Sequence, residues 1–196
     1  MKRNLFACTM LIPVLLVGCT PGPQPTPPPT TPAPTVEPPP QQFMCTPEEG
    51  GHASPCSEAE YQAQLARDKQ YDEAKRVLAA YNKEFERLAR EGATASEELL
   101  SYTAGDYTDL SRDEFSQGYR YEGGEFKTVW VKRLVGESQA SSVVALRACT
   151  DTTSITIMQN GKKLTTGRVA EEEYYFADST EGLKIVEARN TQVESC

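Results

Sequence analysis

The spacing of hydrophobic residues changes along the 196-residue chain, and each change predicts a different kind of segment. Residues 5–17 are almost all apolar, whereas residues 21–40 have only Val36 as a sizeable aliphatic side chain. From Ser57 the apolar side chains recur every three or four positions, and from Phe126 they alternate with polar ones. The pattern therefore predicts a short apolar leader, a segment without a core, a helical region and a region of strands.

The stretch from Ser57 to Gly92 is typical of one long amphipathic helix. Ser57 and Glu60 form a capping-box pattern, and Gly92 is suited to end the helix. Such a helix is long for a globular domain, so we expect either a kink or first turns that protrude. We expect a monomer, with a coiled-coil dimer as the alternative. The apolar positions of this helix are Tyr61, Leu65, Ala74, Leu78, Tyr81, Phe85 and Leu88.

Shorter helical segments follow in residues 96–106 and 110–118, and strands are predicted after Gly123-Gly124. We expect about four antiparallel strands, with a tight hairpin turn at Asn160-Gly161. Helices followed by strands predict an α+β fold, in which a long N-terminal helix and short helices pack in a curved antiparallel sheet. The strands are expected within residues 125–137, 141–159, 167–178 and 182–193.

The N-terminal residues have the pattern of an export signal. Lys2-Arg3 precedes the apolar run of residues 5–17, which is too short to cross a bilayer. The run ends in Leu16-Val17-Gly18-Cys19, which resembles the lipobox of bacterial lipoproteins. This resemblance implies cleavage before Cys19 and acylation of its thiol with chains such as palmitate. We therefore expect residues 1–18 to be a lipoprotein signal peptide, with an ordinary secreted protein as the alternative.

Residues 19–42 are predicted to be the lipidated cysteine followed by a disordered, proline-rich linker. Eleven of the 14 prolines lie between Pro21 and Pro40, in a stretch without aromatic residues. Such a segment cannot bury enough apolar surface to offset the entropy of ordering it. The linker would hold the folded domain, residues 43–196, away from the membrane.

The net charge of the chain, −8, limits the partners that it could bind. Binding of nucleic acid depends on cationic side chains that displace counterions from phosphates, so we expect no nucleic-acid partner. The expected partners are the membrane, reached through the lipid anchor, and an envelope protein or a small apolar ligand. The expected location is extracytoplasmic, on the outer face of the cell membrane.

The cysteines predict two disulfides. Of the six cysteines, Cys8 would leave with the signal peptide and Cys19 would be acylated. An even number of remaining cysteines in an exported chain implies disulfides, and four cysteines allow three pairings. We favour a small disulfide loop within residues 43–56 and a second bridge that holds the C-terminal residue to a strand. These pairs are Cys45 with Cys56, and Cys149 with Cys196.

No metal site and no cofactor are predicted. His52 is the single histidine and lies between Cys45 and Cys56. Its spacing from them does not match the short cysteine pairs of zinc sites, so we interpret it as an exposed loop residue. The acidic stretch that begins at Asp106 lacks the ligand spacing of a calcium loop.

The order of elements from Ser57 to Cys196 resembles the NTF2-like, cystatin-like cone fold, and the domain is similar to one found in many uncharacterised actinobacterial lipoproteins. Besides that order, the similarity lies in short motifs. They are the strand VVALRACTDTTSI, the Asn160-Gly161 turn, the Tyr174-Tyr175 strand and the last strand, which ends in Cys196. The resemblance implies a cone with a cavity, for which the candidate lining residues are Trp130, Asp151 and Tyr174.

Asp151 is the one candidate for a catalytic carboxylate. It follows Cys149 by two residues, so in a strand it shares the face of that cysteine, and this face could point into the cone. A buried Asp151 would act as a general base. Alternatively, it accepts hydrogen bonds from Thr152, Thr153 or backbone amides at a bend, and we favour this interpretation. The run Glu171-Glu172-Glu173 is predicted to be the edge of a solvated strand.

Together these patterns predict a membrane-tethered, non-enzymatic lipoprotein that acts as a binding or scaffolding module of the cell envelope, with no catalytic residues. One alternative is an NTF2-like extracytoplasmic enzyme that uses Asp151 with a neighbouring tyrosine. Another is a phage or prophage lipoprotein that mediates superinfection exclusion.

Overall fold

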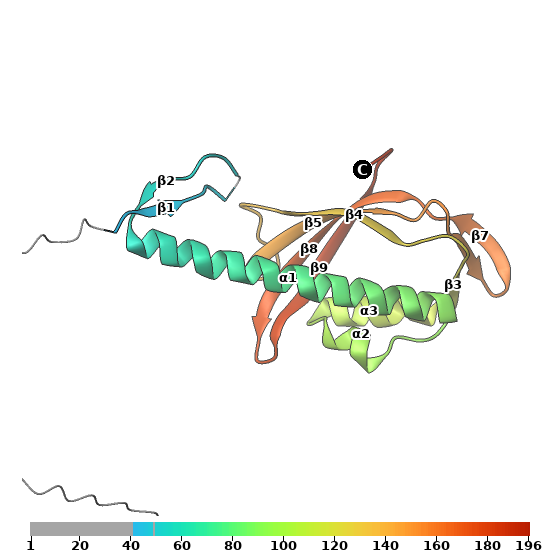
Figure 1. Ribbon diagram of the computed structural model, residues 1–196. Coiled ribbons are helices and arrows are strands. Elements are labelled where there is room, and N and C mark those ends of the chain that lie inside the picture. The colour runs from blue at the N-terminus through green and yellow to red at the C-terminus, as the bar shows by residue number, and fades with distance from the viewer. Residues whose placement is uncertain (1–40, 49) are drawn as a thin grey trace, which may run out of the picture. The chain divides into compact units, whose positions relative to one another are not determined.

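The computed structural model describes residues 41–48 and 50–196. The predicted signal peptide, Cys19 and the linker up to Pro40 lie outside these residues. Within the described ranges, no helix combines the length and the apolar character that a membrane crossing needs. The elements, shown in Figure 1, are β1 (Phe43–Cys45), β2 (Ser54–Cys56), α1 (Glu58–Glu91), α2 (Glu97–Ser101), α3 (Asp106–Ser116), β3 (Tyr119–Glu122), β4 (Lys127–Arg133), β5 (Val144–Asp151), β6 (Thr156–Gln159), β7 (Lys162–Thr166), β8 (Val169–Ser179) and β9 (Gly182–Gln192).

The long helix predicted from the sequence is α1, a single helix of 34 residues. The predicted capping box is present, because the Ser57 hydroxyl accepts from the Glu60 N–H and the Glu60 carboxylate accepts from the Ser57 N–H. Gly92 ends the helix in the left-handed conformation, with φ of 64°. The buried residues of α1 begin at Tyr71, and Leu65 is 44% exposed. The first turns therefore lie outside the main core. Of the two expected alternatives, a kink or protruding first turns, the structure shows the second.

Those first turns of α1 are covered by the β1–β2 hairpin, which the Cys45–Cys56 disulfide closes. The Phe43 and Tyr61 rings pack with centroids 5.4 Å apart, and the Tyr71 hydroxyl donates to Glu48 Oε1 over 2.8 Å. His52 is exposed in the hairpin loop, as predicted. The small disulfide loop therefore packs against the N-terminal half of α1.

Two further sheets make up the rest of the fold. One has four antiparallel strands in the order β4-β5-β8-β9, and the other has three in the order β3-β6-β7. The predicted strand over residues 141–159 is divided, because the chain turns between Asp151 and Thr156 and β6 then joins the smaller sheet. The predicted turn at Asn160-Gly161 is confirmed, and both residues have positive φ, 51° and 74°.

The four-stranded sheet has two faces, which we call the inner face and the outer face. The inner face packs against the buried side of α1, where Leu78 is 1% exposed and Leu146 is fully buried. Because neighbouring residues of a strand point to opposite faces, each strand contributes to both. The inner face carries Val144, Leu146, Ala148 and Thr150 of β5 and Ala170, Glu172, Tyr174 and Phe176 of β8; the outer face carries Ala145, Arg147, Cys149 and Asp151 of β5 and Glu171, Glu173 and Tyr175 of β8.

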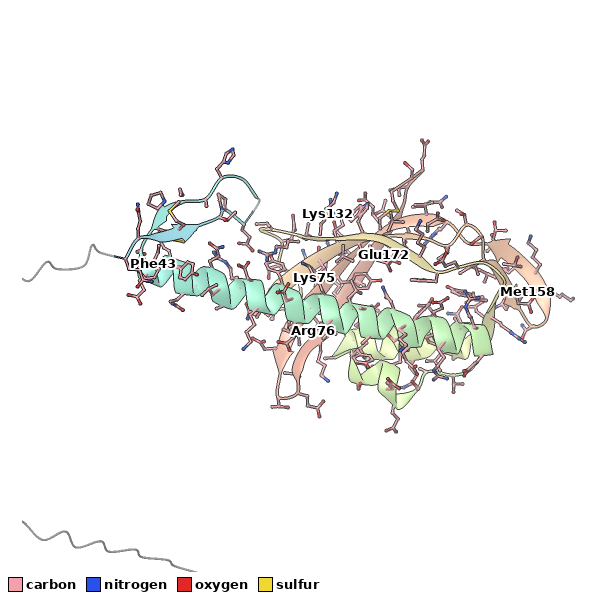
Figure 2. The ribbon with its side chains drawn as sticks, in the orientation of Figure 1. Phe43, Lys75, Arg76, Lys132, Met158 and Glu172 are labelled. Atoms are coloured by element: carbon pink, nitrogen blue, oxygen red, sulfur yellow. A yellow bond between two sulfur atoms is a disulfide. The ribbon has the colours of Figure 1, made fainter. Side chains whose placement is uncertain are left out.

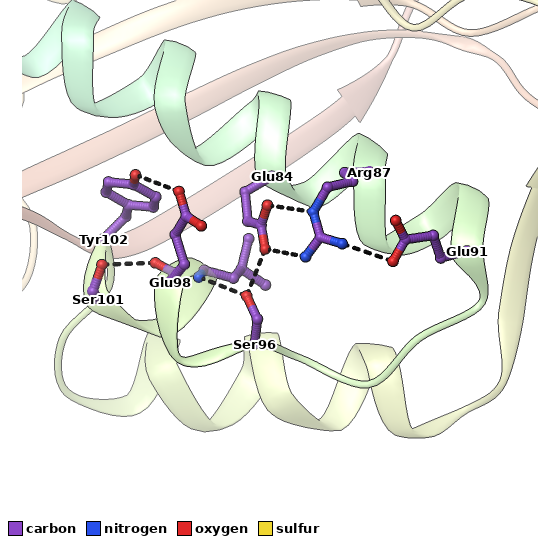
Figure 3. A network of polar contacts seen from close by, with 8 residues as sticks. Glu84, Arg87, Glu91, Ser96, Glu98, Ser101 and Tyr102 are labelled. Carbon is purple, nitrogen blue, oxygen red and sulfur yellow. Dashed lines mark hydrogen bonds and ion pairs between the residues drawn. The ribbon is translucent and has the colours of Figure 1, made fainter.

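A polar network joins the last turns of α1 to the start of α2 (Figure 3). Glu84 is only 6% exposed and accepts two hydrogen bonds from Arg87, at 2.8 and 2.6 Å, and one from the Ser96 hydroxyl at 2.6 Å. Ser96 in turn caps α2 by accepting from the Leu99 N–H. The Arg87 hydrogen bonds lower the pKa of Glu84 to about 2, against the opposing effect of burial. A buried carboxylate is here matched to a cation.

The predicted α+β fold class is confirmed: a long helix and two short helices pack with antiparallel sheet. The number of strands is larger than predicted, with nine in the described residues. The additional strands are mostly short ones of three to five residues. Segments of this length carry too few alternations to give a clear periodic signal.

Candidate functional site

A cavity of about 770 Å³ lies between α1, α3 and the inner face of the sheet, and β3 and β6 contribute to its wall. It is rich in aromatic rings and hydroxyl groups, and it contains two glutamates from different elements, Glu114 of α3 and Glu172 of β8. Glu172 is labelled in Figure 2. The aromatic residues that line it are Tyr81, Phe85, Tyr107, Tyr119, Tyr121, Phe126 and Tyr174.

Simple periodicities bring these residues together. Tyr81 and Phe85 are four residues apart in α1, so they share one face of that helix. Tyr107 and Glu114 are separated by about two turns of α3 and both line the cavity. Glu172 and Tyr174 are two residues apart in β8 and share the inner face. Most of the residues that line the cavity therefore come from helices and strands, and a few, such as Phe126 and Arg168, come from the connections between them.

The polar groups of the cavity make few hydrogen bonds with one another. The Tyr174 hydroxyl donates to Glu172 Oε2 over 2.8 Å, and the hydroxyls of Tyr81 and Tyr107 lie 3.3 Å apart. Among the described residues, Glu114 and Tyr121 have no hydrogen bond from their side chains to another protein group. Their oxygens are thus free to bind solvent or a ligand.

Both glutamates of the cavity have raised pKa values. Burial raises the pKa of Glu172, and the nearby charge of Glu114 raises it further, whereas hydrogen bonding by Tyr174 and the charge of Arg168 oppose the shift. Burial raises the pKa of Glu114 as well. Glu114 is exposed to solvent in the open cavity, yet the surrounding protein removes enough water to favour its neutral form.

Four buried tyrosines of the cavity, Tyr81, Tyr107, Tyr121 and Tyr174, have raised pKa values and remain protonated over the physiological pH range. Burial raises the pKa of Tyr121 to about 12, and it is also the largest cause of the raised pKa values of Tyr107 and Tyr174. The hydroxyl groups are therefore available as hydrogen-bond donors as well as acceptors.

The cations at the cavity are not paired with its glutamates. Arg168 and Arg189 contribute to the lining, but the Arg168 guanidinium donates to Asn190 Oδ1 over 2.9 Å and Arg189 pairs with Glu187 at 2.8 Å. No salt bridge to Glu114 or Glu172 occurs among the described residues. In the same ranges, no group of three or more histidine, cysteine or acidic side chains is arranged to hold a metal ion.

Of the three residues predicted to line the cavity, Tyr174 does so, and it is 5% exposed. Trp130 and Asp151 do not, which corrects the prediction. Asp151 shares the face of Cys149, as expected, but this face is the outer one. The alternation of β5 places Asp151 and Cys149 on one face, and that face is turned away from the cavity.

The local interpretation of Asp151 is confirmed. Its Oδ1 accepts from the Thr153 N–H over 2.9 Å and from the Thr153 hydroxyl over 2.7 Å. These hydrogen bonds lower the pKa of Asp151, whereas a buried general base would need a raised one. Asp151 therefore shapes the bend after β5 and is wrongly placed for chemistry in the cavity.

Trp130 lies on the outer face beside the disulfide that joins Cys149 to the C-terminal Cys196, which we call the C-terminal clamp. The disulfide between Cys149 and Cys196 is present, as predicted, and Trp130 pairs with Cys149 across β4 and β5. The Trp130 Nε1–H donates to the Cys196 carbonyl over 3.3 Å, and Lys132 Nζ lies 4.3 Å from the centre of the Trp130 ring. The indole supports the disulfide instead of lining a ligand site.

Glu172 is the cavity residue whose position differs from the sequence-based prediction. The sequence predicts a solvated strand edge for Glu171, Glu172 and Glu173, but Glu172 lies on the inner face and lines the cavity. Its spacing of two residues from Tyr174 was the available signal. Glu114 was not singled out either, and its distance of seven positions from Tyr107 could have placed both on one side of α3.

The two disulfides indicate an oxidising, extracytoplasmic environment. Cys19, the predicted lipidation site, lies outside the described residues.

Comparisons with known proteins give a fold-level likeness. No protein-family model and no curated protein matches this chain. Among solved structures, the chain is similar to an NTF2-like protein with a cystatin-like fold from Novosphingobium aromaticivorans, at 15% identity, with 71% of this chain and 92% of that chain covered and a TM-score of 0.36.

Proposed function

We propose that this protein is a lipid-anchored envelope protein whose folded domain is a non-enzymatic binding module, with the tyrosine–glutamate cavity as its ligand site. The two disulfides support an extracytoplasmic location. The residues Leu16-Val17-Gly18-Cys19, with the basic and apolar residues before them, support acylation at Cys19. Lipid chains would then hold the domain at the outer face of the cell membrane.

The observation that carries the binding function is the cavity itself. Its volume of about 770 Å³ is within the range of small-molecule sites, roughly 300–1,000 Å³. Protein interiors are otherwise packed with few voids larger than a water molecule. A space of this size, lined by aromatic rings and a few polar groups, is suited to enclose a ligand.

A variant that fills the cavity tests the proposal. Ala170 is 4% exposed and lines the cavity, so Ala170→Trp should place an indole in it. We expect a fluorine NMR screen of a fragment library to find fragments that bind the full chain. Ala170→Trp should weaken the affinity for these fragments at least tenfold. Val169→Trp, one residue away on the outer face, is the matched control and should keep the hits. A library without hits on the wild type, or hits unaffected by Ala170→Trp in a folded variant, would contradict the proposal.

The lipid anchor has its own test. Cells that express the wild-type chain should incorporate labelled palmitate into the protein, and Cys19→Ala should abolish the label. Cys8→Ala is the control, since Cys8 lies in the segment expected to be removed. Labelling that persists in Cys19→Ala would overturn the anchor without affecting the binding site.

A second candidate is an acid–base enzyme that uses Glu172 instead of Asp151, the carboxylate of the enzymatic alternative. It is favoured by the raised pKa of Glu172 and by the hydrogen bond from Tyr174, because a general acid or base works best with a pKa near the working pH. Proton NMR of a bound fragment over time separates the candidates. A binding module leaves the fragment unchanged, whereas an enzyme converts it and Glu172→Gln stops the conversion.

A further inference from the structure

We infer that the cavity selects small organic molecules that carry an ammonium group, with Glu172 and Glu114 as the counter-charges and the surrounding aromatic rings as the walls. This inference rests on the proposed function, because it names the ligand class for the same cavity. It is drawn from three features of the cavity: the placement of the glutamates, the nature of the walls and the pairing of the nearby cations.

The two glutamates reach the cavity from different elements. Glu114 projects from α3 and Glu172 from the inner face of β8. They are near enough for the charge of Glu114 to act on Glu172. Two carboxylates in one partly dry space repel each other, and a cation between them would relieve that repulsion.

The walls are suited to the same type of ligand. Seven aromatic side chains line the cavity, and five of them are tyrosines. The Phe85 ring has its centroid 6.3 Å from that of Tyr121 and 6.4 Å from that of Phe126, so a connected aromatic surface lies beside the charged groups. The faces of aromatic rings carry negative potential and attract organic cations, most strongly where water is excluded.

No protein cation occupies this position. The charged and titratable groups that face Glu172 are Glu114 and Tyr107 of α3, Tyr81 of α1, Tyr121 of β3, Tyr174 of β8, and Arg168 before β8, with Thr150 of β5 as a neutral hydrogen-bonding neighbour. Arg168 is the single cation among them, and its guanidinium is directed to Asn190. The described residues therefore leave the glutamates without a salt bridge.

Ligand charge and protonation of the cavity are coupled. An ammonium ion favours the ionised glutamates, and ionisation needs loss of their protons. Binding of an ammonium ligand should therefore strengthen as the pH rises through the raised pKa of Glu172, as long as the amine stays protonated. A neutral ligand of the same shape should show no such dependence.

The test compares two probes that differ in their head group, 2-phenylethylammonium and 2-phenylethanol. Both are titrated at pH 8 into the full chain by NMR or calorimetry. We expect the ammonium probe to bind at least tenfold more tightly than the alcohol. Glu172→Gln should reduce binding of the ammonium probe about tenfold and leave the alcohol unchanged. Glu171→Gln is the matched control, one residue away on the outer face, and should keep the wild-type affinity for both.

The outcomes separate this inference from the proposed function. Equal affinity for the two probes, or an ammonium affinity that Glu172→Gln leaves unchanged, overturns the cation preference while the cavity remains a ligand site. Failure of both probes to bind also overturns the preference for ammonium ligands. The proposed ligand site is then judged separately, by whether Ala170→Trp removes the binding of library fragments. If both probes bind Ala170→Trp as they bind the wild type, the site lies elsewhere and both proposals fail.

Discussion

The two faces of the four-stranded sheet are built from alternate residues of the same strands, yet the charged side chains on the two faces have different kinds of partner. On the outer face, Glu173 pairs with Arg147 at 2.6 Å, and Asp151 is satisfied by Thr153. One residue from Glu173, on the inner face, Glu172 has the Tyr174 hydroxyl as its partner and a second glutamate nearby. On the outer face the acidic side chains have matched partners, whereas Glu172 on the inner face and Glu114 of α3 beside it have no salt bridge within the described residues.

This difference indicates that a bound ligand would supply the missing partner of the cavity glutamates. A protein selected for stability alone would pair or replace a partly buried carboxylate, because its desolvation is costly. Glu84 shows that the chain can do so, since Arg87 and Ser96 hold its pKa at about 2. The unmatched glutamates of the cavity are therefore consistent with a site completed by a bound molecule.

The largest expected effect concerns the clamp on the outer face. The double variant Cys149→Ser with Cys196→Ser opens a loop with a sequence separation of 47, so we expect a loss of about 4 kcal/mol in the free energy of unfolding. Cys45→Ser with Cys56→Ser, with a separation of 11, should cost less. Denaturant unfolding measures both. Equal losses would mean that the outer face has no special role in stability.

Next comes the paired carboxylate of α1. Glu84→Gln should lower the free energy of unfolding by about 2 kcal/mol at pH 7, because it weakens a charged network that is largely shielded from water. Since the folded-state pKa is lowered, the stabilisation is fully present above the ordinary pKa and is lost as the pH falls toward about 2. Glu91→Gln, the exposed partner of Arg87, is the control and should have little effect. A difference between wild type and Glu84→Gln that persists undiminished at pH 2 would contradict this assignment.

The cavity glutamate should respond in the opposite direction. A raised folded-state pKa means that stability falls as the pH rises from the ordinary glutamate value through the folded one. Glu172→Gln removes this loss, and we expect the variant to be more stable than the wild type by about 1 kcal/mol at pH 8. Thermal unfolding at pH 4 and pH 8 measures the effect. A Glu172→Gln variant that is destabilised at pH 8 would mean that the carboxylate is matched after all.

The smallest effect belongs to the ion pair on the outer face. Arg147 and Glu173 keep 41% and 27% of their side-chain surface in solvent, so a double-mutant cycle with Arg147→Met and Glu173→Gln should give a coupling of about 0.5 kcal/mol. The coupling should decrease as salt is added. A coupling of several kcal/mol would place the stability of the outer face in its ion pairs instead of its disulfide.

The sequence predicted the features that depend on neighbouring residues. The Ser57–Glu60 capping box, Gly92 and the Asn160-Gly161 turn are local, and the structure confirms them. The side on which Asp151 lies was not predictable in this way, because β5 is buried on both faces and its hydrophobic residues do not alternate. The smaller sheet depends on pairing of β6 with β3, far apart in sequence.

Glu172 illustrates the same limit at the cavity. Within Glu171-Glu172-Glu173 the three side chains are chemically identical, so composition gives no reason to separate the middle one. Its role follows from the alternation of β8 and from α3 packing nearby with Glu114. The first was visible in the sequence, and the second needed the tertiary structure.

The most direct measurement is the pKa of Glu172 itself, followed by carbon NMR of its carboxyl group in the full chain. We expect Glu172 to titrate above the ordinary glutamate value of 4.5, and to shift downward when 2-phenylethylammonium saturates the cavity. Titration of Glu172 at or below 4.5 in the free protein, with no change on addition of the ammonium probe, would show that the inner-face carboxylate is already matched and would contradict its role as a binding group.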